Sequence, residues 1–174
     1  FGIGRKRKKS SIGIHDLDKI SFPLVYTTTN KNHKFIPLNS EKELDISEIL
    51  DTTDVGKDYG SLLGQSSQVP IILDEEQNTV SFPPIINAAV TTVTTKTKNL
   101  FVEVTGLNKD DAEDMLSVVA TVLQSAGFTL ESVKITGAKN SAPKLEYRKM
   151  TVNPSLINQI LGLNLSSSKI ISSL

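Results

Sequence analysis

Two consecutive prolines, Pro83 and Pro84, restrict the folds open to this chain more than any other feature of it. Proline has no backbone N–H and pushes the residue before it toward extended geometry, so the pair cannot lie inside a helix or a central strand. The prolines follow a β-like segment at 79–82, which polar turn residues at 74–78 separate from the apolar run 69–73. This pattern predicts a β-hairpin whose second strand ends in a rigid diproline wall.

A strand is predicted at 100–106, with side chains that alternate between two faces. The faces differ in polarity, with Phe101, Glu103 and Thr105 on one and Leu100, Val102 and Val104 on the other.

The strongest helical pattern covers 109–126, where apolar residues recur every three or four positions. Asn108 can cap the first turn, and Gly127 can take the left-handed position after the last turn. A further strand is predicted at 129–135. The sequence therefore predicts that the strand-helix-strand unit 100–135 is the core, with the helix on the aliphatic face and the polar face free for a ligand.

Shorter elements are predicted elsewhere: strands at 12–15, 23–28 and 33–36, and helices at 46–50, 54–63, 153–161 and from near Ser166 onward. We therefore expect an α/β fold of the α+β kind, a mixed sheet with helices packed on one face, followed by the start of a small helical domain. The expected parts are a basic arm at 1–10, the α/β domain at 11–140 and the truncated helical domain at 149–174.

Five of the nineteen basic residues are consecutive, and the rest of the chain is acidic on balance. The run comprises Arg5, Lys6, Arg7, Lys8 and Lys9. It could contact RNA phosphates, with an affinity that falls as salt rises, or it could be a solvated arm. The acidic body argues against a large nucleic-acid footprint.

The chain has no cysteine, which excludes a disulfide framework and a thiolate nucleophile. Its two histidines are far apart in sequence, so no metal site is expected. No apolar run is long enough to span a membrane, and no signal-peptide layout is present, which fits a cytoplasmic setting. The chain begins with Phe1 rather than Met, and we expect it to be cut from a longer protein.

Five residues could form a small-molecule pocket: Ile72, Ser81, Phe101, Glu103 and Thr105. The carboxylate and the two hydroxyls would hydrogen-bond a polar ligand beside the aromatic ring, with Ile72 as an apolar wall. The alternative is a solvated sheet face, since charged residues are mostly exposed.

His15, with Asp16 and Asp18 nearby, is expected to order a turn, because no serine or cysteine nucleophile motif accompanies it. The glycines in residues 1–5 lack a preceding strand and the spacing of a phosphate loop, so ATP is not expected to bind this fragment.

Five motifs resemble the beta subunits of phenylalanyl-tRNA synthetase, in the form found in archaea and eukaryotes. They are GRKRKKSSIGIHDLD at 4–18, FIPLN at 35–39, SFPPIIN at 81–87, NLFVEVTG at 99–106 and EYRK at 146–149. Their order is that of the family, over essentially the whole chain. The resemblance implies that residues from about 10 to 140 form the family's editing domain, a mixed α/β module.

Members of this family join phenylalanine to its tRNA with ATP, and the editing domain hydrolyses tRNA wrongly charged with tyrosine. A hydrophobic pocket rejects an isostere that merely adds a hydroxyl by only roughly a hundredfold, whereas a site that hydrogen-bonds the hydroxyl can separate the pair by about 10⁴ to 10⁵. The resemblance therefore implies a second site with a partner for the tyrosine hydroxyl.

The resemblance also implies roles for the pocket residues. Archaeal members have Asp-x-Thr where this chain has Glu103 and Thr105, so the carboxylate, which would accept the tyrosine hydroxyl, is one methylene longer here, as in the eukaryotic form. Ser81 matches a pocket serine and, with Thr105, would orient polar groups. Ile72 matches a residue that is usually leucine and, with Phe101, would sandwich the ring. No catalytic residue is assigned, because a positioned water, helped by the terminal adenosine hydroxyl, could hydrolyse the reactive ester.

The implied partners are tRNA specific for phenylalanine, tyrosine as the editing ligand, and the synthetase alpha subunit in a heterotetramer of two alpha and two beta subunits. No membrane partner is expected. The fragment itself is expected to need no cofactor, while ATP and Mg²⁺ would serve the whole synthetase at a site outside it. The alternative is a non-catalytic module that docks tRNA or the partner subunit.

Overall fold

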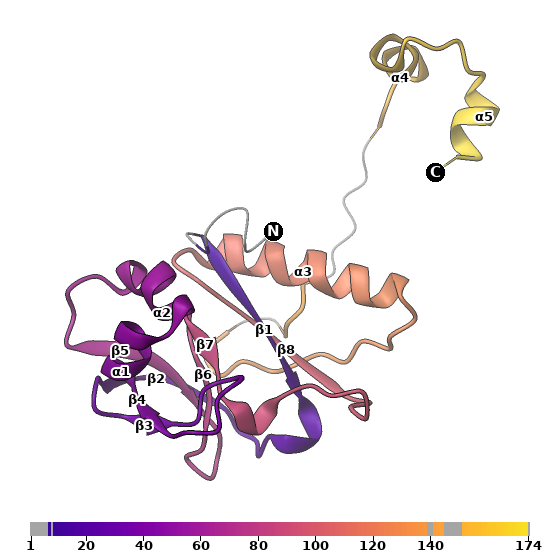
Figure 1. The fold of residues 1–174 in the computed structure, drawn as a ribbon. Helices are drawn as coiled ribbons and strands as arrows, with labels where there is room; N and C mark the ends of the chain where they lie inside the picture. The colour runs from indigo at the N-terminus through magenta and orange to yellow at the C-terminus, as the bar shows by residue number, and fades with distance from the viewer. Residues whose placement is uncertain (1–6, 8, 139–140, 145–150, 174) are drawn as a thin grey trace. The chain divides into compact units, whose positions relative to one another are not determined.

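The computed structural model describes residues 7, 9–138, 141–144 and 151–173. The chain divides into two compact units, residues 1–144 and 145–174, and each is described by itself (Figure 1). The predicted boundaries at 10, 140 and 149 stay a prediction.

The first sheet consists of β1 (Ser10–Asp16) and β8 (Leu100–Gly106), which pair in antiparallel register from Ser10 opposite Gly106 to Asp16 opposite Leu100. This register places Gly13 opposite Glu103. The short 3-10 helix η1 (Leu17–Lys19) follows β1, and the Asp16 side chain accepts a hydrogen bond from Asp18 N at its start.

The second sheet has the order β2-β5-β6-β7, with the predicted hairpin at its centre. Its strands are β2 (Val25–Asn30), β5 (Gln68–Leu73), β6 (Thr79–Phe82) and β7 (Ile86–Asn87). The diproline lies between β6 and β7, where Ile85 N donates to Phe82 O at 2.8 Å and closes a tight turn. The prediction that the prolines end the second hairpin strand is therefore confirmed.

Most of the buried core lies against this second sheet, not at the predicted unit 100–135. It is a cluster of aliphatic and aromatic side chains: Phe35, Ile46, Ile49, Val69, Ile71, Phe82, Ile85 and Ala88. The core joins β5 and β6 to α1 (Ile46–Thr52), α2 (Asp54–Tyr59), the 3-10 helix η2 (Gly60–Leu63) and the small β3–β4 pair (Lys34–Phe35 with Leu44–Asp45).

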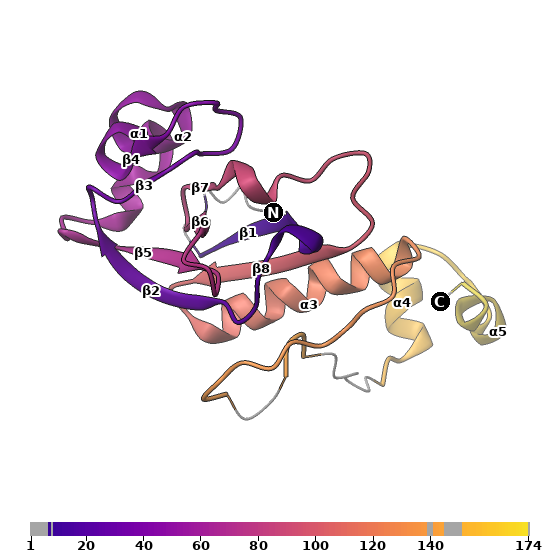
Figure 2. The same ribbon diagram turned by 90° about the horizontal axis from the view of Figure 1, so that it is seen from below.

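Helix α3 (Lys109–Ser125) follows β8 and confirms the predicted helix, with Asn108 accepting from the N–H groups of Asp110 and Asp111. A Cβ at Gly106 would lie 3.5 Å from the Ala112 Cβ, so α3 covers the β8 face that carries Val104, as predicted. Figure 2 shows α3 lying along β8, whereas α1 and α2 lie beside β3 and β4.

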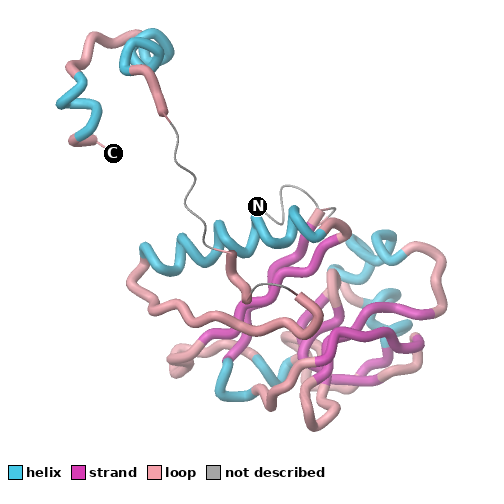
Figure 3. The backbone as a smooth tube through the Cα atoms, turned by 180° about the vertical axis from the view of Figure 1, so that it is seen from behind, coloured by secondary structure: helices cyan, strands magenta, loops and turns pink. Residues whose placement is uncertain are grey.

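Three details of the predicted architecture are wrong. The strand predicted at 129–135 is irregular apart from an isolated bridge between Val133 and Ala142. The strand that pairs with β8 is β1, a segment distant in sequence, and residues 129–135 are not part of that two-stranded sheet. The named strands pair only in antiparallel fashion among the described residues. In the first unit the helices pack on two different sheets, α3 on β8 and the α1–α2 pair on the core of the second sheet (Figure 3). The α+β class itself is confirmed.

In the second unit, α4 (Pro154–Leu161) starts after the cap Asn153 and ends at Gly162, which has φ 65°. A second helix, α5 (Ser167–Ile171), is capped by Ser166. Both helices confirm the sequence pattern. The 3-10 helix η3 (Ala89–Thr91) belongs to the first unit and follows β7.

Candidate functional site

Ser81 and Glu103 come from different sheets and meet at a hydrogen bond. The Ser81 hydroxyl lies 3.0 Å from Asn87 Oδ1 and 3.3 Å from Glu103 Oε1, so its single hydrogen is shared between two acceptors. Ser81 is 2% exposed, and the register of the second sheet places it between Ile72 on β5 and Asn87 on β7. The polar pair is thus held by buried sheet backbone rather than by a loop.

The Glu103 carboxyl is buried although the residue as a whole is only part-buried. Its Oε2 atom is inaccessible and has no hydrogen-bond partner. Burial raises the pKa of Glu103 from 4.5 to about 7, against the opposing effect of the Ser81 hydrogen bond. A buried charge with one satisfied oxygen is costly, so the group is poised between its acid and its ionised form near neutral pH.

His15 lies within β1 and is fully buried, so the prediction that it orders a turn is wrong. Its Nδ1 is 2.8 Å from the Thr91 hydroxyl, which itself donates to Ala88 O. Thr91 therefore accepts from Nδ1–H, and Nε2 carries the lone pair. Nε2 is buried without a partner, and burial lowers the pKa of His15 from 6.5 to about 4, so the imidazole is neutral.

Gly13 lies beneath both unpartnered groups. A Cβ at Gly13 would be 2.7 Å from His15 Nε2 and 3.0 Å from the Glu103 carboxyl carbon, and it would overlap Oε1. The imidazole nitrogen and the carboxyl therefore flank one point that only glycine leaves open.

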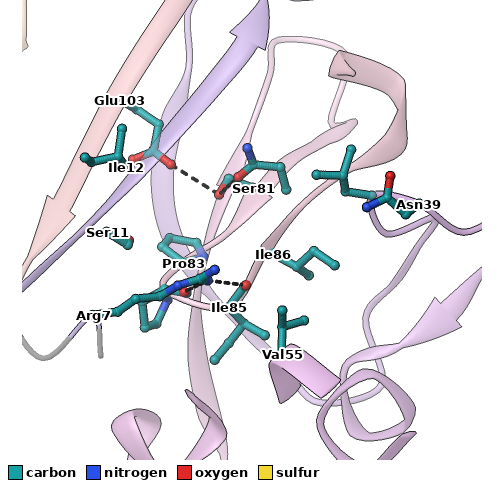
Figure 4. Close-up of a pocket in the computed structure, with 13 residues that line it drawn as sticks. Arg7, Ser11, Ile12, Asn39, Val55, Ser81, Pro83, Ile85, Ile86 and Glu103 are labelled. Carbon is teal, nitrogen blue, oxygen red and sulfur yellow. Dashed lines mark hydrogen bonds between the residues drawn. The ribbon is translucent and has the colours of Figure 1, made fainter. Parts of the chain in front are cut away.

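A cavity of about 220 Å³ lies beside the diproline, and Ser81 and Glu103 open onto it (Figure 4). Its lining comprises Arg7, Ser11, Ile12, Leu38, Asn39, Val55, Ser81, Pro83, Pro84, Ile85, Ile86, Asn87 and Glu103. The lining combines a carboxylate, a guanidinium, two hydroxyls and two amides with apolar walls, a composition suited to a small polar ligand with an apolar body.

The B3/4 domain family matches residues 7–116, the segment that holds the cavity and all of its lining. The chain belongs to the B3/4 domain family. It is 40% identical over 171 residues to the phenylalanine–tRNA ligase beta subunit of Sulfurisphaera tokodaii, an alignment that covers 97% of this chain and 32% of that protein. The corresponding subunit of Archaeoglobus fulgidus is 38% identical over 174 residues, covering 99% of this chain and 32% of the relative.

A solved N-terminal fragment of the phenylalanyl-tRNA synthetase beta subunit from Pyrococcus horikoshii is similar in fold, with a TM-score of 0.82 and 36% identity. The match covers 97% of this chain and 49% of that fragment. The resemblance to these beta subunits is thus confirmed, and the chain spans about a third of the length of the curated relatives it matches.

Of the five predicted pocket residues, the B3/4 domain brings only Ser81 and Glu103 into the cavity lining. Thr105 shares a hydrogen bond of 2.8 Å with Ser11, which does line the cavity. Ile72 is buried beside Ser81 on the neighbouring strand.

Phe101 lies outside the lining. The centre of its ring is 6.1 Å from the centre of the His15 ring and 5.6 Å from that of Phe22, which it meets edge-on. The proposed sandwich of a substrate ring between Ile72 and Phe101 stays a prediction.

Arg7, predicted as part of an RNA-binding arm, lies at the cavity. Its guanidinium donates to Pro84 O and Ile85 O at 2.6 Å each and lies 4.2 Å from the centre of the Tyr59 ring. Lys9 pairs with Asp111 at 3.6 Å on the surface. Arg5, Lys6 and Lys8 lie outside the described residues, so their RNA role stays a prediction.

The residue pattern did not single out Asn39, Asn87 or His15 as site residues. Each stands inside or at the end of a quoted motif, which was the available signal. A separate observation concerns Tyr26, the cross-strand neighbour of Ile72: burial and then the charge of Glu103 raise the pKa of its phenol.

Among the described residues, no three histidine, aspartate or glutamate side chains are grouped as metal ligands would be. No helix within residues 7, 9–138, 141–144 and 151–173 has the length and apolar character needed to cross a membrane.

Proposed function

We propose that this B3/4 domain hydrolyses tyrosine from tRNA specific for phenylalanine, as the editing part of a phenylalanine–tRNA ligase beta subunit. The observation that carries the proposal is the Glu103 carboxyl, which opens onto a cavity beside Ser81 while its Oε2 remains buried and unpartnered.

The tyrosine hydroxyl is the feature that such a site must recognise. Glu103 accepts the hydroxyl hydrogen, and the phenol of tyrosine, with an ordinary pKa of about 10, is neutral and able to donate it. Phenylalanine would leave the buried acceptor without a partner, which costs about 1–3 kcal/mol and more for a charged group. A site of this kind rejects the analogue without a hydroxyl strongly.

The hydrolytic step uses a water molecule. Water oxygen attacks the ester carbonyl carbon, the bond between that carbon and the ribose oxygen breaks, and the proton of the water passes to the ribose oxygen. The Ser81 hydroxyl is committed to Asn87 and Glu103, so it orients polar groups rather than attacks. Holding a reactive ester and a water in place can supply a large part of the rate enhancement.

This function implies the partners and setting of the relatives' enzyme. These are tRNA specific for phenylalanine, the alpha subunit in a tetramer of two alpha and two beta subunits, and the cytoplasm. ATP and Mg²⁺ would serve the synthetic reaction, which belongs to parts of the enzyme outside this chain.

The test compares the chain with Glu103→Ala and Ser81→Ala for release of tyrosine from mischarged tRNA specific for phenylalanine, with correctly charged tRNA alongside. Glu131→Ala removes an exposed glutamate and is the matched control. We expect the two site variants to lose tyrosine release and the control to keep it.

A second measurement does not depend on tRNA, which the isolated chain could bind too weakly for the hydrolysis assay. Free tyrosine, but not phenylalanine, should perturb the NMR signals of Ser81 and its neighbours. If neither amino acid changes the NMR signals, the editing proposal fails and the chain is instead a docking module.

A further inference from the structure

A second cavity of about 520 Å³ adjoins the first. It lies between β1, the start of β8 and the segment after β7, and its lining includes Ile14, Thr91, Thr92, Val93 and Leu100. Three residues line both cavities: Leu38, Asn39 and Asn87. The two cavities therefore meet at these three residues, which we call the lip.

The interior of the second cavity is apolar in effect because its hydroxyls are already used. The Thr91 hydroxyl accepts from His15 and donates to Ala88 O, and the Thr92 hydroxyl donates to Ala89 O at 2.6 Å. What remains facing a ligand is aliphatic surface, which suits a flat, weakly polar group.

The lip is the polar part of this arrangement. Asn87 Oδ1 accepts from Ser81, but no hydrogen bond involves its Nδ2 or the Asn39 side chain among the described residues. Leu38 N donates to Asn87 O at 2.8 Å, which pins one side of the lip to the other. Asn39 adopts φ 65°, a left-handed conformation that asparagine tolerates better than most residues. Two carboxamides with spare donors and acceptors thus stand where the cavities join.

We propose that the second cavity binds the 3′-terminal nucleoside of an aminoacyl-tRNA, with Asn39 and Asn87 hydrogen-bonding the ribose hydroxyls between the nucleoside and the amino acid. This inference rests on the proposed function. The first cavity, about 220 Å³, is smaller than the roughly 300–1,000 Å³ of most ligand sites, whereas an amino acid esterified to adenosine needs a second space next to the first. The polar cavity then holds the amino acid, and the apolar cavity holds the base.

The first test titrates the 174-residue chain separately with adenosine and with L-tyrosine by NMR. Adenosine should perturb the amides of Ile14 and Val93 and the side-chain amides of Asn39 and Asn87. Tyrosine should perturb residues around Ser81 and Glu103. Adenosine shifts that fall elsewhere, or no shifts at all, would overturn the inference while leaving the tyrosine result to judge the proposed function.

The second test uses a matched pair of exposed valines. Val93 is 41% exposed and lines the second cavity, whereas Val90 is 53% exposed and does not, so both tolerate a surface charge. Val93→Glu should weaken binding of a non-hydrolysable amide of tyrosine and 3′-amino-3′-deoxyadenosine by about tenfold or more, because burying the charge against the base is costly. Val90→Glu should bind it like the unmodified chain, and neither variant should change L-tyrosine binding.

Equal affinity of the two variants for the amide would show that the second cavity does not hold the nucleoside. If adenosine maps to the second cavity and tyrosine binds nowhere, the nucleoside site stands and the proposed editing function fails.

Discussion

Gly13 and Glu103 are cross-strand partners on β1 and β8, and the glycine leaves the space in which the Glu103 carboxyl lies. Gly13 does not have a positive φ, so its backbone would accept another residue. The requirement for glycine at this position is therefore one of volume, set by the carboxyl and by the His15 ring above it.

Gly13→Ala should displace the Glu103 carboxyl and destabilise the fold by about 1–3 kcal/mol, the usual cost of overpacking. Chemical denaturation measures the change, and Gly13→Ala combined with Glu103→Ala provides the cross-check. Because the clash is between these two residues, the double variant should be more stable than the sum of the single effects predicts. Strict additivity would mean that the carboxyl is not what fills the space.

His15 should make the protein less stable as the pH falls. Its pKa is about 4 in the folded protein and 6.5 in the unfolded chain, so the unfolded state binds more protons between these values. The contribution of His15 to the free energy of unfolding is fully present above pH 6.5. It decreases by roughly 3 kcal/mol as the pH falls from 6.5 to 4.

Glu103 should act in the opposite direction over nearly the same range. Its pKa is about 7 when folded and 4.5 when unfolded, so the folded state binds more protons and stability falls by roughly 3 kcal/mol as the pH rises from 4.5 to 7. The two effects largely offset each other between pH 4.5 and 6.5. The free energy of unfolding of Glu103→Gln, measured by denaturation, should therefore rise with pH, and that of His15→Phe should fall. Unchanged slopes in both variants would show that neither group is buried as described.

The length of the Glu103 side chain should matter as well as its charge. Glu103→Asp withdraws the carboxyl by one methylene from Ser81 Oγ, now 3.3 Å away, and should weaken tyrosine binding by about tenfold, the cost of roughly one hydrogen bond. Glu103→Gln keeps the reach and an acceptor oxygen and should bind tyrosine more tightly than the aspartate variant does. Calorimetric titration with tyrosine ranks the two, and the reverse order would contradict direct recognition at this distance.

Arg7 should stabilise the diproline turn, whereas the nearby Lys9 should not. Arg7→Ala removes two charge-assisted hydrogen bonds to Pro84 O and Ile85 O and the contact with the Tyr59 ring, and we expect a loss of about 2–3 kcal/mol. Lys9→Ala breaks only an exposed ion pair and should cost less than about 1 kcal/mol. Comparable losses from the two variants, measured by denaturation at equal salt, would argue that Arg7 is a solvated arm residue after all.

Most of the confirmed predictions depended on residues that are neighbours in the chain. Asn108 caps α3, Gly127 has φ 95° after its end, and the diproline terminates β6. Each of these features is decided by local backbone chemistry, such as a missing N–H, a side-chain oxygen near free amides, or the absence of a Cβ.

The predictions that failed concerned which segments meet. The alternation along 100–106 identified the face that carries Glu103 but not the strand opposite it, and it predicted a neighbouring strand at 129–135 in the same core. Pairing with β1 instead puts His15 and Gly13 against that face.

The sequence by itself therefore determined the local elements, their ends and the family motifs that pointed to Ser81 and Glu103, because those depend on short-range geometry and residue type. Only the tertiary structure decided that the Glu103 carboxyl is buried next to Ser81, that Gly13 and His15 surround it, and that two cavities share the lip at Asn39 and Asn87. The physical reason is that burial and strand register arise from contacts between segments far apart in the chain, and these contacts set the pKa and the free hydrogen-bonding capacity of a side chain.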